Sequence, residues 1–297
     1  MYSSFSPGMP AQWDGANVET LLGLEQVEEG AYRSRFNEDN RNGRVFGGQL
    51  IGQALRAAQG TVAEGRFATA MQVLFLQGGL VDIPIDYCVT TLQEGKRFSS
   101  RRIEASQGER RLLDAHATFQ IPAQGITHAL PPYHAVPSPD DVLSAGDLAS
   151  RGSPQFAGGN WQRMELPSLE LKVVNPEQHL TSKHDRPEFA FWVRLRQPLG
   201  DDPAVHSAAL AYLSDYRLNS AALTSHVPIR DGHSRYYVAS LNHSLWLHRP
   251  CRADDWLLFS TESPAAQGER GLTLARLYDK HGVLVASASQ ECLISGR

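Results

Sequence analysis

Two short stretches decide the fold, because they repeat one pattern: residues 113–120 read LDAHATFQ and residues 284–291 read LVASASQE. In both stretches Leu, Ala and Ala occupy every second position. Such an alternation is typical of a strand that buries one face. Each stretch also closes a similar series of patterns, so the sequence indicates one structural unit that is present twice.

Outward from these strands, each half contains one helical pattern and several strand-like runs. In the first half a helix is predicted at residues 47–58, and strands at 66–76, 85–91, 97–105 and 111–120. In the second half strands at 168–174 and 189–195 precede a helix at 204–218, and strands follow at 236–247, 256–261, 271–278 and 283–293. One helix followed by consecutive strands predicts an α+β fold with an antiparallel sheet wrapped around the helix, rather than parallel βαβ units.

These patterns divide the chain into four parts. Residues 1–18 are expected to form a loosely ordered leader, and residues 19–121 the first half. Residues 122–165 are rich in Pro, Gly, Ser and Asp and are predicted to be a linker, with a short helix near 140–149. Residues 166–297 then form the second half.

A duplicated unit can be searched for positions that are apolar in one copy and polar in the other. The helices align with Val45 on Val205 and Leu50 on Leu210, and the long strands align with residues 77–78 on 249–250. Under these alignments three polar residues of the second half replace apolar ones: Asp215 takes the position of Leu55, Ser240 that of Ala68 and Gln290 that of Phe119.

The three polar residues suit the activation of a water molecule. Asp215 lies on the predicted helix within a largely apolar stripe, between Ala211 and Leu218, and a desolvated carboxylate has a raised pKa that suits a general base. Ser240 and Gln290 would orient the water by hydrogen bonds, because buried polar groups need partners. The alternative is that backbone or solvent satisfies each group separately. Gly47 and Gly48, at the start of the first helix, either donate backbone N–H groups to an oxyanion or only permit close packing.

Four motifs carry a resemblance to a known family. They are VFGGQ at 45–49, GKRFSSRR at 95–102, NHSLWLHRP at 242–250 and GVLVAS at 282–287 with Gln290 beyond it. The chain thereby resembles the bacterial acyl-CoA thioesterase II (TesB-like) family. The resemblance implies a double hot-dog fold and a hydrolytic site made of Asp215, Ser240 and Gln290. It also implies no cofactor apart from the coenzyme A of the substrate.

The expected activity is hydrolysis of acyl-CoA to a free fatty acid and coenzyme A. Three alternatives stay open: a thioesterase for acyl-carrier-protein substrates, a hot-dog hydratase or dehydratase, and a non-catalytic acyl-thioester-binding protein. A hydratase pairs its acidic residue with a nearby His, but the first His after Asp215 is His226. Lys96, Arg97 and Arg101 could hold the phosphates of coenzyme A, or could form a solvated strand edge.

Composition narrows the partners and the compartment. The 28 Lys and Arg against 32 Asp and Glu give a net charge of −4, which predicts no nucleic-acid or membrane partner. The N-terminal residues lack the basic and apolar regions of a signal peptide. Three widely spaced cysteines, Cys88, Cys251 and Cys292, predict neither a disulfide framework nor a zinc site, which favours the cytoplasm. Pairing into a homo-oligomer through sheet edges is also expected.

Overall fold

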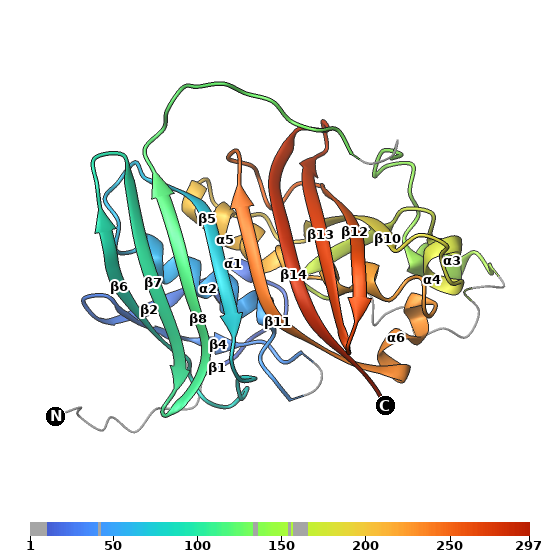
Figure 1. Cartoon of the computed structure of the whole chain (residues 1–297), viewed down its shortest axis with the longest axis horizontal. Coiled ribbons are helices and arrows are strands. Elements are labelled where there is room, and N and C mark those ends of the chain that lie inside the picture. Colours follow the sequence, from blue (N-terminus) through green and yellow to red (C-terminus); the bar gives the residue numbers. More distant parts are fainter. Residues whose placement is uncertain (1–10, 41–42, 133–135, 154–155, 157–165) are drawn as a thin grey trace.

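The computed structural model describes residues 11–40, 43–132, 136–153, 156 and 166–297. Within these ranges one antiparallel sheet of twelve strands crosses the whole molecule (Figure 1). Its strands follow one another in the order β2 (Leu24–Glu28), β3 (Ala31–Ser34), β6 (Asp86–Glu94), β7 (Phe98–Gln107), β8 (Arg110–Gln120), β5 (Phe67–Phe75), β11 (Tyr236–Leu247), β14 (Leu284–Gly296), β13 (Arg270–Asp279), β12 (Leu257–Gln267), β10 (Glu188–Leu195) and β9 (Leu169–Val173).

The two halves join at the centre of this sheet, where β5 pairs with β11. The pairing is antiparallel and runs from Ala70 opposite Trp246 to Leu74 opposite Asn242. Because the sheet does not stop between the halves, each half completes the other's edge at this point.

Two helices, α2 (Gly47–Gln59) and α5 (Pro203–Ser214), lie behind the sheet and pack side by side (Figure 1). They run in opposite directions, because Gly48 lies against Tyr212 and Gly52 lies against Ala208. A Cβ atom on Gly52 would come within 3.0 Å of the Ala208 carbonyl oxygen, so glycine allows the two backbones to approach. The start of α2 therefore meets the end of α5.

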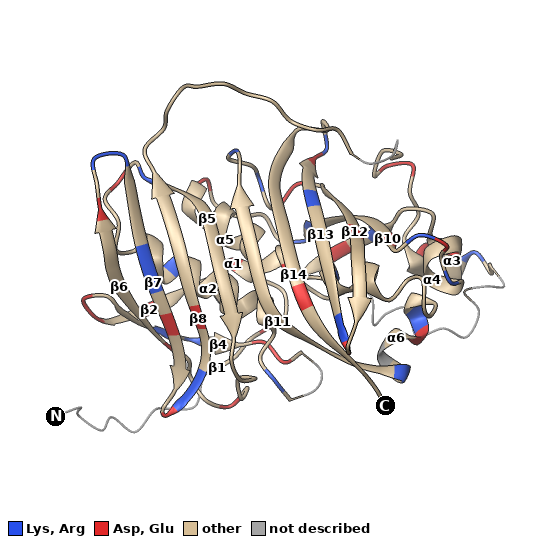
Figure 2. Ribbon diagram, viewed as in Figure 1, with Lys and Arg blue, Asp and Glu red and all other residues tan. Residues whose placement is uncertain are grey.

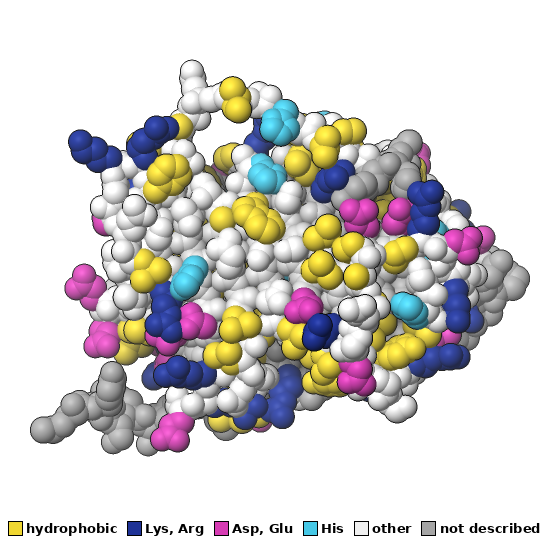
Figure 3. All heavy atoms as spheres, in the orientation of Figure 1, with side chains coloured by type: hydrophobic (Ala, Val, Ile, Leu, Met, Phe, Trp, Pro, Cys, Tyr) yellow, Lys and Arg dark blue, Asp and Glu magenta, His cyan; other side chains and the backbone are white. Residues whose placement is uncertain are grey.

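The sheet buries the face that is turned toward these helices. In β7, Ser99, Arg101, Ile103 and Ala105 are buried, and the residues between them are more exposed. One hydrophobic core contains buried side chains of both halves. Much of the opposite face meets solvent, and Figure 3 shows charged and histidine side chains interspersed there with apolar ones, while over the second half a smaller cluster that includes Trp192, Leu258 and Tyr278 is buried. The α+β class and the long strands predicted from alternation are confirmed.

The second helix is shorter than its apolar pattern predicted. It ends at Ser214, and Asp215 is its C-cap. Arg217 then adopts a left-handed conformation with φ of 61°, and a 3₁₀ helix, η3, follows at Leu218–Ala222. Left-handed backbone cannot continue an α-helix. The predicted helix at 204–218 is therefore wrong at its C-terminal end, and Asp215 lies at a chain turn.

Several short elements were not predicted. The helix α1 (Val18–Leu22) and strands β2 and β3 precede α2, while α4 (Pro176–Thr181) and α6 (Ile229–Arg235) lie between strands of the second half. β1 (Ala11–Gln12) pairs in parallel with β4 (Phe36–Asn37), so part of the expected leader takes part in a strand pair. Residues 13–18 of that leader are also described and lead into α1, whereas residues 1–10 lie outside the described residues.

The segment between β8 and β9 crosses the outer face of the second half of the sheet. Its backbone carbonyls accept hydrogen bonds from side chains of that face: Leu130 from the Tyr278 hydroxyl at 3.1 Å, Pro137 from Trp192 Nε1 at 3.0 Å and Pro139 from Lys172 Nζ at 2.7 Å. The short predicted helix lies further along as α3 (Ala145–Ser150), with a capping box between Ser144 and Asp147. No helix in the described ranges combines the length and the apolar character that crossing a bilayer requires.

Strand pairing corrects one detail of the alignment between the halves. Ala117 pairs with Met71, and its repeat counterpart Ala288 pairs with Leu245. Two residues further along each strand, on the same face, Phe119 pairs with Ala68, whereas Gln290 pairs with His243. The residue at the position of Ala68 is therefore His243, and not Ser240 as the sequence alignment proposed.

Candidate active site

Asp215 lies where the end of α5 meets the start of α2. A Cβ atom on Gly47 would lie 2.5 Å from Asp215 Oδ2, so the carboxylate occupies space that only glycine leaves open. The backbone N–H of Gly48 donates a hydrogen bond to the carboxylate. The N-terminus of a helix also favours a nearby negative charge. Gly47 thus leaves room for Asp215, while Gly48 allows close packing against the Tyr212 backbone and donates its N–H to the carboxylate.

A β-bulge brings Ser240 onto the same face of β11 as His243. The register of β11 against β14 shifts between Ser240 and Asn242, which leaves Leu241 without a partner. In a regular strand, residues three positions apart point to opposite faces. The bulge reverses the alternation, so both side chains point toward α5. Ser240 Oγ donates to Asp215 Oδ1 at 3.2 Å.

Gln290 connects this pair to the rest of the sheet. Its side chain is fully buried, and Nε2 donates to Ser240 Oγ at 2.7 Å and to Asn219 Oδ1 at 2.9 Å. The structure therefore brings together Asp215, Ser240 and Gln290, the three residues that the sequence singled out. Asn219, which lies on η3, is an additional member.

Two further residues of the network, His243 and Ser214, were not found from the sequence. His243 is fully buried, and its Nδ1 lies 2.6 Å from Gln290 Oε1. Its Nε2 lies 2.9 Å from the hydroxyl of Ser214, the last residue of α5. The signal that could have identified His243 was its position in the NHSLWLHRP motif, once the strand register had been corrected.

The network shifts the ionisation of its two titratable members in opposite directions. Burial raises the pKa of Asp215 above its usual value, although His243, Gln290, Ser240 and Gly48 each oppose this rise by favouring the carboxylate. Burial lowers the pKa of His243, and the Asp215 carboxylate opposes that change. A carboxylate with a raised pKa binds a proton more readily, which suits a general base.

The corresponding part of the first half has no such network. Leu55 and Phe119 are fully buried apolar side chains, and Ala68 packs against the core. At these matched positions, the described residues place a carboxylate, a hydroxyl and a carboxamide in contact with one another in the second half and not in the first.

Arg101 was expected to hold a phosphate of coenzyme A, and the structure shows it buried and hydrogen-bonded within the protein. Its side chain is 2% exposed. Its five N–H donors are all engaged by Thr61, Gln93, Ser100 and Glu94, with an ion pair of 2.6 Å to the Glu94 carboxylate. Lys96 and Arg97 instead lie exposed in the hairpin between β6 and β7, which is basic in Figure 2. Their contact with coenzyme A stays a prediction.

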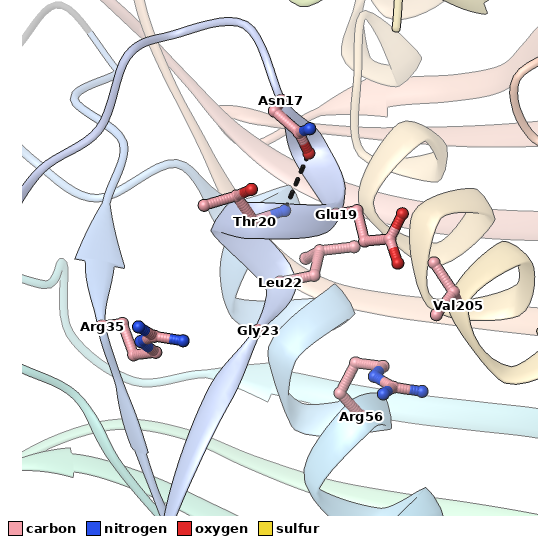
Figure 4. A pocket seen from close by; sticks show the side chains of 8 residues that line it. All are labelled: Asn17, Glu19, Thr20, Leu22, Gly23, Arg35, Arg56 and Val205. Carbon is pink, nitrogen blue, oxygen red and sulfur yellow. Dashed lines mark hydrogen bonds between the residues drawn. The ribbon is translucent and has the colours of Figure 1, made fainter. Parts of the chain in front are cut away.

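A surface pocket lies at the opposite ends of the two central helices. It has a volume of about 370 Å³ and is lined by residues of α1, α2 and α5 and their flanking segments, Asn17, Glu19, Thr20, Leu22, Gly23, Arg35, Arg56 and Val205 (Figure 4). Arg56 is near the end of α2 and Val205 near the start of α5, so the pocket is separate from Asp215. Among the described residues, no cluster of His, Cys, Asp and Glu is arranged to hold a metal ion.

Comparison with known proteins matches nearly the whole chain. The family model described as acyl-CoA thioesterase N-terminal domain matches residues 37–120, and that of the C-terminal domain matches residues 139–294. Acyl-coenzyme A thioesterase 8 of Mus musculus is 34% identical over 291 residues, which cover 93% of this chain and 88% of the relative. Acyl-CoA thioesterase 2 of Haemophilus influenzae is 30% identical over 285 residues, which cover 94% and 96%.

Solved structures show the same architecture. The acyl-CoA thioesterase II TesB2 of Mycobacterium marinum superposes with a TM-score of 0.77 at 32% identity, covering 95% of this chain and 99% of that one. A hot-dog-fold protein of Alicyclobacillus acidocaldarius superposes with a TM-score of 0.72 at 15% identity, covering 94% and 98%. The predicted double hot-dog fold is thereby confirmed.

Proposed function

This chain belongs to the acyl-CoA thioesterase family and is a thioester hydrolase, and on that basis we propose that Asp215, Ser240 and Gln290 hydrolyse acyl-CoA to a free fatty acid and coenzyme A. The observation that carries the proposal is the hydrogen-bonded series from Gln290 through Ser240 to the Asp215 carboxylate.

In the proposed reaction Asp215 acts as a general base toward water. The water oxygen attacks the carbonyl carbon of the thioester while the carboxylate accepts one of its protons. The tetrahedral intermediate then expels the thiolate of coenzyme A, which takes up a proton, and the acyl group leaves as a carboxylic acid. Positioned hydrogen-bond donors supply most of the acceleration in such a scheme.

Ser240 and Gln290 have supporting roles in this reaction. Ser240 donates to Asp215 Oδ1, which fixes the carboxylate so that its other oxygen can face the water. Gln290 donates to Ser240 and thereby directs the hydroxyl proton toward Asp215. The oxyanion is stabilised by the start of α2, where the backbone N–H of Gly47 is the remaining candidate donor because that of Gly48 already serves Asp215.

The test is release of free thiol from a panel of acyl-CoA substrates, followed with a thiol reagent. We expect release by the unaltered chain, and a loss of roughly 100-fold or more in kcat for Asp215→Asn and for Gln290→Ala. Full activity of Asp215→Asn would refute the site assignment. If short-, medium- and long-chain acyl-CoA release no thiol but acyl-carrier-protein thioesters do, the substrates are acyl-carrier-protein thioesters.

The hydratase alternative can be judged by the position of His243. The structure places this His beside the Asp215 network, as a hydratase would require. However, its ring is fully buried, and both nitrogens contact protein groups, Gln290 and Ser214. A His that transfers protons to a substrate needs a nitrogen within reach of that substrate. This geometry supports hydrolysis over hydration.

The compartment and the assembly of the protein belong to the same proposal. The three cysteines are free thiols, as expected for a reducing cytoplasm. Pairing of whole chains into a dimer or tetramer would use the outer strands β2 and β9, which end the sheet. Cell fractionation and light scattering of the purified chain test these two points.

A further inference from the structure

We propose that His243 is a positioning residue, whose Nδ1–H fixes the carboxamide of Gln290 in the orientation that hydrolysis requires. The inference rests on the proposed function, because it assigns a role to Gln290 in that reaction. It concerns a residue that has no part in the proposed chemistry and no access to substrate.

The orientation of the Gln290 carboxamide follows from its partners. One end of the amide lies 2.9 Å from Asn219 Oδ1 and 2.7 Å from Ser240 Oγ. With the nitrogen at this end, both of its hydrogens have acceptors, and the Ser240 hydroxyl keeps its own proton for Asp215. If the amide were reversed, Ser240 would donate to Gln290 and would no longer support the carboxylate.

His243 is the group that opposes this reversal. Its Nδ1 lies 2.6 Å from the other end of the amide, where Oε1 stands. A hydrogen on Nδ1 therefore makes a good hydrogen bond with the oxygen, whereas it would face the hydrogens of a reversed amide. Since both side chains are fully buried, water cannot compensate for the lost bond.

The fold holds the imidazole ring in this orientation from two sides. His243 and Gln290 are directly opposite each other in the pairing of β11 with β14. On its other side, Nε2 lies 2.9 Å from Ser214 Oγ, at the end of α5. Burial opposes the charged form of the ring, and the pKa of His243 is lowered accordingly. In the neutral ring with hydrogen on Nδ1, Nε2 accepts from the Ser214 hydroxyl, whose single proton is then no longer available to the Ala211 carbonyl oxygen, its other acceptor at 2.7 Å.

The series of donors thus has one direction. His243 donates to Gln290, Gln290 donates to Ser240, and Ser240 donates to the Asp215 carboxylate. Hydrogen bonds arranged in this way reinforce one another in a buried environment. Loss of the His243 donor should therefore make the position of the Asp215 carboxylate less well defined, without removing any group that touches the substrate.

Two substitutions of His243 separate its two contacts. In His243→Asn, the carboxamide nitrogen takes approximately the place of Nδ1 and can still donate to Gln290, but the contact with Ser214 is lost. In His243→Gln, the polar end takes approximately the place of Nε2 and retains Ser214, but not Gln290. We expect His243→Asn to keep kcat within about threefold, and His243→Gln to lose roughly 10- to 100-fold in kcat with little change in KM.

Two further variants complete the experiment. Ser214→Ala removes only the contact on the Nε2 side and keeps the Nδ1–H donor to Gln290, so it should lose less kcat than His243→Gln. In a Gln290→Ala background, His243→Gln should cause no additional loss of kcat, because His243 acts through Gln290. Thermal unfolding of every variant shows whether the fold is retained.

Several outcomes would overturn the inference. Retention of kcat by His243→Gln with loss by His243→Asn would show that Ser214 is the relevant partner. Full activity of both variants would show that the hydrogen bond to Gln290 has no role in catalysis. If the unaltered chain releases no thiol from any acyl thioester, the proposed function fails first. If Asp215→Asn and Gln290→Ala both impair thiol release but His243→Gln does not, the proposed function stands and this inference alone fails.

Discussion

Substitution of Gly47 by Ala tests the position of the Asp215 carboxylate without changing any polar group. The added Cβ would lie 2.5 Å from Asp215 Oδ2 and 3.4 Å from its Cγ. An ordinary non-bonded contact is about 3.5 Å, so the carboxylate oxygen has to retreat by about 1 Å. A misplacement of about 1 Å in a catalytic group can reduce the rate roughly 100-fold. We therefore expect kcat for thiol release to fall by that order in Gly47→Ala.

Stability should change little. Gly47 is the first residue of α2, so only part of the roughly 0.5–1 kcal/mol by which Ala is favoured over Gly in a helix interior is gained, and moving the buried carboxylate away from its hydrogen bonds offsets that gain. In the matched variant Gly48→Ala, the Cβ would collide with the carbonyl oxygen of Tyr212, which is backbone and cannot move aside. That variant should unfold at a lower temperature. Gly125→Ala, where no heavy atom lies within 4 Å, is the neutral control.

The assay is steady-state thiol release at several acyl-CoA concentrations, together with a thermal melt of each variant. Loss of kcat with an unchanged melting temperature supports the assignment of Asp215 as the base. A fully active Gly47→Ala would show that the reaction tolerates a displaced carboxylate, and the reasoning would be wrong. Because the substitution keeps the backbone N–H, a loss of activity could not be attributed to a missing oxyanion donor.

Three other predictions concern ionisation, the hydroxyl and the buried cation. Asp215 must be ionised to act as a base, and burial raises its pKa. In a pH–rate profile, kcat/KM should therefore fall as the pH drops, with a midpoint above about 3.9, the usual pKa of an Asp side chain. Ser240→Ala should lose roughly 10-fold or more in kcat for thiol release. Ser240→Thr keeps the hydroxyl, so its kcat should lie closer to that of the unaltered chain, and equal kcat for both variants would remove Ser240 from the site. Arg101→Met should lower the free energy of unfolding, measured in urea, by on the order of 2 kcal/mol, because it leaves the partners of five hydrogen bonds unpaired. It should leave KM for acyl-CoA unchanged, and a raised KM in a stable variant would support a contact between Arg101 and a phosphate.

The long strands could be predicted because alternation is a local property of the sequence. In β8, for example, Leu113, Ala115 and Ala117 are buried and the residues between them face outward. The early termination of α5 could not be predicted in this way. The apolar spacing continues through Leu218, and the left-handed conformation of Arg217 has no signal in an isolated sequence, since Arg does not favour it.

The candidate site was predicted in part, for a related reason. Comparison of the halves identified Asp215 and Gln290 by their apolar counterparts, and the structure places both in one network with Ser240. His243 was missed because the alignment of the long strands was anchored at residues 77–78 and 249–250, beyond the strand ends, and it placed Ser240, three residues from His243, at the position of Ala68. The first half also has a bulge between Ala68 and Ala70, and an alignment that assumes regular strands cannot locate it.

The two halves represent two self-consistent ways of filling the same place in the fold. In the second half each polar atom of Gln290 has a partner, so its burial is compensated. In the first half Phe119 and Leu55 fill the space with apolar atoms. A mixture of the two arrangements would leave buried polar groups unpaired, and each such group would lower the free energy of unfolding by about 1–3 kcal/mol. A single substitution such as Phe119→Gln should therefore destabilise the first half and create no second site, because neither Ala68 nor Leu55 could complete the hydrogen bonds.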